Sequence, residues 1–377
     1  MTSSPDSRLA EHDVDPIRGF LPGEDPLQRL PARYVPWERL AFDLPALVST
    51  HLLRDAIEEL PLLDTDALES EAELRRAMLL LSVLGGACAW SRPEPPTRLP
   101  RSISIPWSEV AERLDRPMII SHASIVLHNW RRIDPAGEIV AKNLRTLQCF
   151  RGGPDEEWFY LVTVEIEARG ARALPLLLAA REAAATGDTV KLATSLEALS
   201  GVIDDLIHVL GQMEPGCRHD VFYHRVRPFL SGWPEPGMIY EGVTTEPVQL
   251  HGGSAAQSSL IQSIDAGLDV PHPHPGTRPF LMAMRHYMPP RHRAFVELLE
   301  LGPSTRDAAA GSPSSADAYD ACIDALDRFR KAHMGITARY ITQQARSVES
   351  AIGTGGTEYA DFLRRTRTET NDRRIGN

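Results

Sequence analysis

Apolar residues recur every three to four positions along most of this 377-residue chain, which is the spacing of amphipathic α-helices. The period is clearest between residues 192 and 213, where leucine, isoleucine and methionine keep to one side and Asp188 stands in the N-cap position. The preceding segment "EEWFYLVTVEIEARGARALPLLLAAREAAA" has the same spacing, and few stretches alternate with a period of two. The sequence therefore predicts a mainly α fold with little sheet.

Proline and glycine divide the chain into three parts. Residues 1–16 have neither the basic start nor the apolar stretch of a signal peptide, and we expect a disordered lead there. Residues 17–105 contain two helical segments, "LPALVSTHLLRDAIEELP" and "LESEAELRRAMLLLSVLGGACAW", before a proline-rich connection at 91–107. Residues 106–377 show long helical periods. The prediction is a small helical N-terminal domain followed by a large helical C-terminal domain.

The composition of the chain limits which partners it is expected to bind and in which cell compartment it is expected to lie. A net charge of −11 argues against nucleic acid or an anionic membrane as a partner. The longest apolar run, residues 77–90, is too short to span a bilayer, so no membrane span is predicted. The four cysteines lie far apart and match no zinc spacing, which indicates reduced thiols in a cytoplasmic protein.

A histidine interrupts the apolar stripe of the predicted helix "DRFRKAHMGITARYI". The stripe consists of Cys322, Leu326, Phe329, Ile336 and Tyr340, and His333 falls in its gap. No second histidine or cysteine follows at i+3 or i+4 to complete a zinc pair, and Gly335 offers a small neighbour for a flat cofactor. Two interpretations stay open: a core histidine satisfied within the protein, or an axial ligand of haem.

Loops rich in small residues are predicted on both sides of this helix. Residues 301–320 are rich in glycine, serine and alanine. Residues 348–359 contain a glycine run at 353, 355 and 356 but lack the lysine of a P-loop. This second segment is interpreted either as a surface loop or as a lid that closes over a substrate.

Two other groups are candidates for ligand binding. Arg227 in "FYHRVRPFLSGW" has aromatic and apolar neighbours, so it should pair with a carboxylate, either the protein's own or a substrate's. His272 and His274 in "PHPHPG" are close enough for a metal site, although a solvated turn is the expected role. The chain has no GxSxG elbow, which argues against a serine hydrolase.

Nine segments resemble, in chain order, the motifs of the indoleamine 2,3-dioxygenase family. They are "GFLPGEDPL", "LPARYVPWE", "LHNWRRIDP", "FYHRVRPFLSGW", "YEGV", "GGSAAQSSLIQSID", "YMPPRHRAFV", "RKAHMG" and "GTGGTEYADFL". The resemblance covers roughly residues 19–369, which is nearly the whole chain. The resemblance implies a helical fold with a small N-terminal and a large C-terminal domain, haem b between them, and O₂ as co-substrate.

The resemblance also implies roles for single residues. His333 matches the proximal haem ligand, and Arg227 matches the arginine that binds the tryptophan carboxylate. Thr354 matches a loop threonine that contacts the substrate ammonium and carboxylate, with Gly353 and Gly355 in the same substrate-binding loop. The pocket walls are assigned to Phe222 and Tyr223 on the indole side, to Phe159 and Thr163 on the distal side, and to Ser254 and Ala255 at the haem edge.

One position departs from the family pattern. His122 stands where the family commonly has tyrosine, and Ile125 and Val126 follow it in the pocket wall. A distal histidine is a feature of the related tryptophan 2,3-dioxygenases, where it hydrogen-bonds the indole N–H. Three roles for His122 stay open: the same contact, the lining of a pocket for a different indole, or a place at the pocket rim without substrate contact.

The activity implied by the resemblance is haem-dependent cleavage of the indole C2–C3 bond of L-tryptophan by O₂, giving N-formylkynurenine without a protein acid or base. One alternative is a specialised-metabolism oxygenase or monooxygenase that acts on a substituted tryptophan or another indole. Another is a non-catalytic haem sensor, against which the carboxylate clamp and the lid argue. A monomer that depends on an external reductant is expected.

Overall fold

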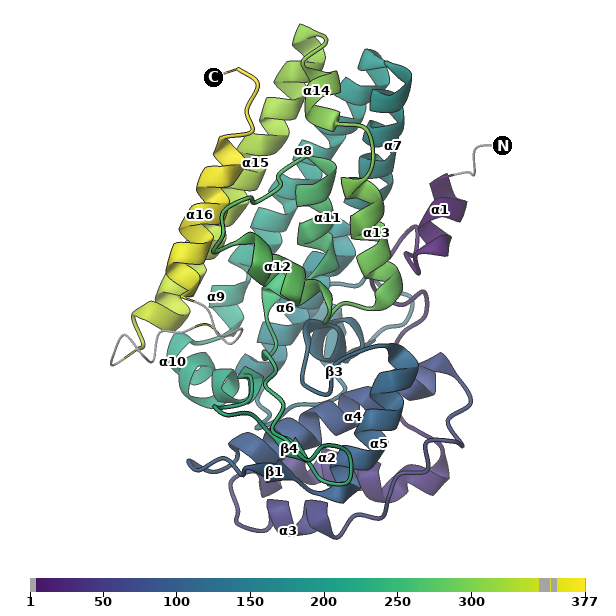
Figure 1. Ribbon diagram of the computed structural model, residues 1–377, viewed down its shortest axis with the longest axis vertical. Helices are drawn as coiled ribbons and strands as arrows, with labels where there is room; N and C mark the ends of the chain where they lie inside the picture. Colours follow the sequence, from purple (N-terminus) through teal and green to yellow (C-terminus); the bar gives the residue numbers. More distant parts are fainter. Residues whose placement is uncertain (1–4, 346–352, 354–357, 377) are drawn as a thin grey trace.

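The computed structural model describes residues 5–345, 353 and 358–376, and these are mainly helical, as the apolar spacing predicts (Figure 1). The strands are short and form two separate pairs. The parallel pair joins β1 (Arg98–Leu99) to β4 (Ile239–Tyr240), and the antiparallel pair joins β2 (Trp130–Arg132) to β3 (Leu144–Thr146). The hydrophobic core is therefore built mainly between helices.

Four helices form the lower part of the molecule in Figure 1. They are α2 (Val35–Leu47), α3 (Leu53–Glu58), α4 (Glu71–Trp90) and α5 (Arg101–Leu114), with the short η1 (Ala32–Tyr34) before them. α4 is buried on every side from Ala77 to Ala89, since α2, α3 and α5 pack around it. A capping box holds its start: the Ser70 hydroxyl accepts from the Glu73 N–H, and the Glu73 carboxylate accepts from the Ser70 N–H.

Long helices form the upper part of the molecule (Figure 1). They are α6 (Pro154–Gly170), α7 (Ala173–Thr186), α8 (Thr189–Gly211), α11 (Ser259–Gly267), α13 (Pro290–Glu300), α15 (Pro313–Thr337) and α16 (Tyr359–Asn371). α15 packs along α8, and α16 lies beside α15. The expected N-cap of α8 is confirmed, because the Asp188 carboxylate accepts from the Lys191 N–H at 2.9 Å.

Short segments connect these helices. They are η2 (Ala123–Leu127), η3 (Ala141–Asn143), α9 (Met213–Gly216), α10 (His219–Val221), η4 (Phe222–Val226), η5 (Arg227–Leu230), η6 (Ala255–Gln257), α12 (Arg278–Arg285), α14 (Thr305–Ala309) and η7 (Ala338–Thr342). No helix in the described part of the chain is long and apolar enough to cross a membrane.

The expected disordered lead is wrong for residues 5–16. This stretch contains α1 (Pro5–Glu11), which packs against α7. Leu9 is fully buried and Val14 nearly so, because both side chains join the hydrophobic core. Two apolar residues in a polar segment were too weak a pattern to predict this from the sequence.

Two predicted loops are also shorter than expected. The proline-rich connection at 91–107 ends early, because α5 begins at Arg101 and continues through the expected domain boundary between residues 105 and 106. Residues 301–320 contain α14 and the start of α15, whose N-cap Ser312 accepts from the Ser315 N–H. The serine-rich composition there marks helix caps rather than one long loop. The division into two domains stays a prediction.

Candidate functional site

A cavity of about 310 Å³ lies between α6, α15 and the short segments η2, η4 and η6. Its lining is mainly apolar, which is typical of sites for small molecules and cofactors. The predicted site residues that line it are His122, Ile125, Val126, Phe159, Thr163, Phe222, Arg227, Ser254, Ala255, His333 and Gly353. Thr354 and Gly355 lie outside the described residues.

Three π-helical segments shape the wall of this cavity. η2 contributes Ile125 and Val126, η4 contributes Phe222, and η7 contributes Tyr340 and Ile341. The wider turn of a π-helix shifts side chains out of the α-helical register, and such turns are frequent at functional sites. Apolar periodicity cannot distinguish them from α-helix, so the sequence did not predict them.

His333 faces the cavity from α15, next to Ile336 and Thr337. The predicted stripe divides here: Cys322 and Leu326 are buried in the core, whereas the residues from 329 onward line the cavity. Burial, assisted by the positive charge of Arg330, lowers the pKa of His333 to about 4. The imidazole is therefore neutral at neutral pH, which is the form that binds a metal. Gly335 does not line the cavity, contrary to its expected role beside a flat cofactor.

The donor set around His333 fits haem. Among the residues that the structure describes, no group of three or more histidine, cysteine, aspartate or glutamate side chains is arranged to hold a metal ion. A metal bound to the single nitrogen of His333 must bring its other ligands with it, as the porphyrin of haem does. The mainly apolar lining suits such a flat apolar group.

Arg227 and a cluster of aromatic rings form another part of the wall. Phe222 lies against Phe159 with ring centroids 4.6 Å apart, and against Tyr340 at 5.6 Å. The Arg227 guanidinium carbon lies 5.2 Å from the centroid of the Tyr223 ring, a cation–π contact. Burial lowers the pKa of Arg227, but an arginine stays charged at neutral pH.

Tyr223 does not line the cavity. Its ring supports the Arg227 guanidinium, so its role in the structure is to position the cation. Phe222 does line the cavity, in line with its expected place beside an indole. The two aromatic residues of this pair therefore have different surroundings.

One part of the cavity wall is polar. His122 Nε2 lies 2.9 Å from Glu167 Oε1, and the Ser258 hydroxyl donates to the same oxygen at 2.7 Å. The His122 backbone N–H donates to Gln257 Oε1 at 2.9 Å. The sequence did not predict Glu167, Ser258 or Gln257 as residues of the site. Glu167 had a detectable signal, because it lies one turn after Thr163 on the same face of α6.

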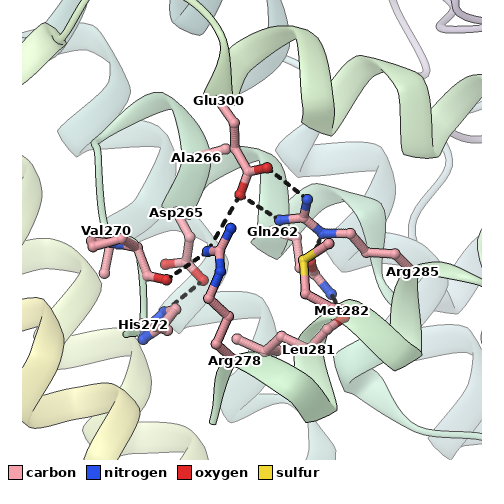
Figure 2. Close-up of a pocket in the computed structure, with 11 residues that line it drawn as sticks. Gln262, Asp265, Ala266, Val270, His272, Arg278, Leu281, Met282, Arg285 and Glu300 are labelled. Atoms are coloured by element: carbon pink, nitrogen blue, oxygen red, sulfur yellow. Dashed lines mark hydrogen bonds and ion pairs between the residues drawn. The ribbon is translucent and has the colours of Figure 1, made fainter. Parts of the chain in front are cut away.

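A second group of buried charged residues, His272, Asp265 and Arg330, lines another part of the same cavity and was not among the predicted site residues. His272 Nδ1 lies 2.8 Å from Glu369 Oε2, and its Nε2 lies 3.3 Å from both Asp265 and Arg330. Figure 2 shows His272 and Asp265 pointing toward each other, and shows Arg278 and Arg285 converging on Glu300.

The expected solvated turn at His272 is wrong, because only 3% of this residue is exposed. The expectation holds for His274, which is exposed and whose backbone N–H donates to Glu369 Oε1. Burial would raise the pKa of Asp265, but the Arg330 and His272 charges and their hydrogen bonds outweigh it and hold that pKa below its usual value.

A mainly helical protein whose mainly apolar cavity is lined by the neutral His333 and by Arg227 has the features of a haem-binding protein for a small anionic ligand. Sequence comparison gives the family. The profile described as "Indoleamine 2,3-dioxygenase" matches residues 8–373. The chain belongs to the indoleamine 2,3-dioxygenase family, whose members are haem-dependent oxidoreductases that use O₂.

Curated relatives match nearly full length. Indoleamine 2,3-dioxygenase 2 of Mus musculus is 37% identical over 96% of this chain and 94% of its own. Indoleamine 2,3-dioxygenase 1 of Mus musculus is 35% identical over the same shares. A fungal relative, named 6-hydroxytryptophan 2,3-dioxygenase fscD of Fusarium equiseti, is 32% identical over 96% of this chain and 97% of its own.

Proposed function

We propose that this protein cleaves the indole C2–C3 bond of L-tryptophan with O₂ and releases N-formylkynurenine. One observation carries the proposal: a single apolar cavity is lined both by His333, a neutral metal ligand, and by Arg227, a cation suited to a carboxylate. A sensor of gas or redox state needs the first group but not the second.

The residues of the cavity have distinct tasks in this proposal. His333 holds the haem, which when bound supplies the oxygen chemistry. Arg227 binds the substrate carboxylate, and its fork of donors matches the two carboxylate oxygens. Phe159 and Phe222 hold the indole by ring contacts. The apolar lining excludes water, which strengthens the carboxylate contact and keeps the substrate in one orientation.

The roles of the loop residues and of the residues at the haem edge are proposals. Thr354 is proposed to contact the substrate ammonium and carboxylate, and Gly355 to belong to the same loop. Gly353 lines the cavity, which supports a role for this loop at the site. Ser254 and Ala255 are proposed to lie at the haem edge. No acid or base is assigned.

The second candidate substrate is a substituted tryptophan. The name of the Fusarium equiseti relative supports it, because that protein is described as acting on 6-hydroxytryptophan. The polar pair of His122 and Glu167 supports it as well, since unsubstituted indole has a wholly apolar benzo ring. A cytoplasmic monomer supplied with electrons by an external reductant completes the proposal.

The test is a single-turnover product analysis. The haem-loaded protein is reduced without oxygen, L-tryptophan is added, then O₂, and the product is analysed by mass spectrometry. A ring-opened product with two added oxygen atoms would support the dioxygenase. One added oxygen atom would indicate a monooxygenase, and haem binding without any product would contradict the proposal for L-tryptophan.

Arg227→Ala tests the carboxylate contact. We expect L-tryptophan affinity to fall by about 2–5 kcal/mol, the usual cost of removing one partner of a buried charge pair. Arg225→Ala is the matched control, because Arg225 is exposed and lies two residues earlier in η4. Equal affinity of the two variants, measured by titration of the ferric protein, would remove Arg227 from the site.

A further inference from the structure

The pair formed by His122 and Glu167 has no task in the reaction described above. Both residues line the cavity, yet only 5% of His122 and 2% of Glu167 are exposed. Burying a carboxylate and an imidazole is costly, so their place in a mainly apolar wall calls for a ligand or a structural reason. Fold stability alone would be served as well by an apolar pair.

The orientation of the His122 ring follows from its contacts. A carboxylate only accepts, so His122 Nε2 carries the hydrogen that it donates to Glu167 Oε1. In the neutral imidazole, Nδ1 is then an acceptor. No described residue forms a hydrogen bond with Nδ1, and the backbone contact to Gln257 holds the residue in place. His122 lines the cavity, and these contacts hold its acceptor nitrogen in one orientation at the wall.

Glu167 adds a second sign that the cluster is incomplete. Its Oε1 accepts hydrogen bonds from both His122 and Ser258, whereas its Oε2 is buried without a hydrogen-bond partner among the described residues. Buried polar atoms in native proteins nearly always have partners. The pair can therefore accept a hydrogen bond from a ligand, but it has no further N–H or O–H group to donate.

The position of the pair within the cavity identifies the part of the substrate that it faces. Phe159, whose ring lies against Phe222 in the wall that also contains Arg227, is eight residues before Glu167 on α6. At 1.5 Å per residue this separation is about 12 Å along the helix axis. With the carboxylate held at Arg227, the far end of tryptophan is its benzo ring. The indole N–H belongs to the five-membered ring, next to the bond that is cleaved.

We propose that His122, held by Glu167, accepts a hydrogen bond from a hydroxyl group on the benzo ring of the substrate, so that the protein prefers a ring-hydroxylated tryptophan over tryptophan. This inference rests on the proposed function and names its substrate class. His122 is the specificity-determining residue. Glu167 is a positioning residue, which acts by holding the imidazole tautomer.

The experiment compares dissociation constants on one protein. The ferric haem-loaded enzyme is titrated with L-tryptophan and with the isomers hydroxylated at each benzo carbon, and binding is followed by the haem absorbance. We expect at least one isomer to bind roughly tenfold more tightly than L-tryptophan, since a site built for a hydroxyl leaves an acceptor unpaired when the hydroxyl is missing.

Variants then test whether the preference for a hydroxylated tryptophan depends on His122 and Glu167. His122→Phe should remove the preference, because phenylalanine keeps a ring of similar size without an acceptor. Glu167→Gln should reduce it, and Glu167→Asp should restore part of it relative to the glutamine variant. Ile125→Val, an apolar change in the same wall, should alter both dissociation constants by the same factor and leave their ratio unchanged.

The outcomes separate this inference from the proposed function. Equal affinities for L-tryptophan and every hydroxylated isomer would overturn the inference alone, and so would a preference that survives in His122→Phe. Failure of every tryptophan to bind the haem-loaded protein would overturn the proposed function as well. The haem spectrum of each variant shows whether it has folded, and a variant without it is replaced by His122→Leu, whose side chain has no hydrogen-bond acceptor.

Discussion

His122 and His272 are both buried histidines paired with carboxylates, but their surroundings differ. His122 uses one ring nitrogen for Glu167, and the other forms no hydrogen bond with the described residues. His272 has both nitrogens engaged, one with Glu369 and the other with Asp265 and Arg330. The first arrangement leaves the imidazole able to bind a ligand. The second joins α11, α15 and α16, so it is a cross-link within the fold.

His333 extends this comparison. It lines the cavity without a carboxylate partner among the described residues, and its lowered pKa keeps it neutral, the form that binds a metal. The number of ring nitrogens already engaged by the protein therefore distinguishes a metal ligand, a substrate contact and a structural histidine. The following predictions test these assignments, and the largest expected effect comes first.

His333→Ala should abolish stable haem incorporation, since its neutral imidazole is the proposed ligand of the iron in the cavity. The measurement is the haem absorbance of the purified protein after loading. His208→Ala is the control, because His208 is an exposed histidine on α8 and its loss should leave the spectrum unchanged. A normally ligated spectrum in His333→Ala would contradict the assignment.

Asp265→Ala should lower the free energy of unfolding by about 3–5 kcal/mol, because it leaves Arg330 buried without its carboxylate. Asp204→Ala is the matched control. Asp204 pairs with Arg328, two residues before Arg330 on α15, but that pair is about half exposed and should contribute less than about 1 kcal/mol. The measurement is urea unfolding. A similar loss of unfolding free energy in the two variants would contradict the structural role assigned to the Asp265 and His272 group.

His292 should make stability fall in mild acid. Burial, with the positive charge of Arg75, lowers its pKa to about 3, whereas an unfolded histidine has a pKa of about 6.5. The unfolded state therefore binds the proton first, and stability falls as the pH drops from about 6.5 toward 3, by up to about 1.4 kcal/mol per pH unit.

Comparison of the chain with His292→Phe isolates this contribution. Phenylalanine fits beside Phe20, whose ring centroid lies 4.7 Å from the His292 ring. The variant should lose less stability than the parent between pH 7 and pH 5.5 in urea unfolding. An identical pH dependence in both proteins would show that His292 does not titrate in this way.

Part of the site could be predicted from the sequence. Residues with local signals, such as His333 on its apolar stripe and Arg227 in its apolar setting, do meet in one cavity. The partners of those residues could not be predicted. Glu167 and Ser258 are 45 and 136 positions from His122, and no local pattern connects them.

The sequence by itself determined the helical class, the N-cap at Asp188 and the histidine on an apolar stripe, because these depend on neighbours within one or two helical turns. Only the tertiary structure decided that His272 is a buried cross-link, that residues 5–16 join the core, and that Glu167 holds His122. Burial and charge pairing join residues that are distant in sequence, and the physical state of a histidine depends on those partners.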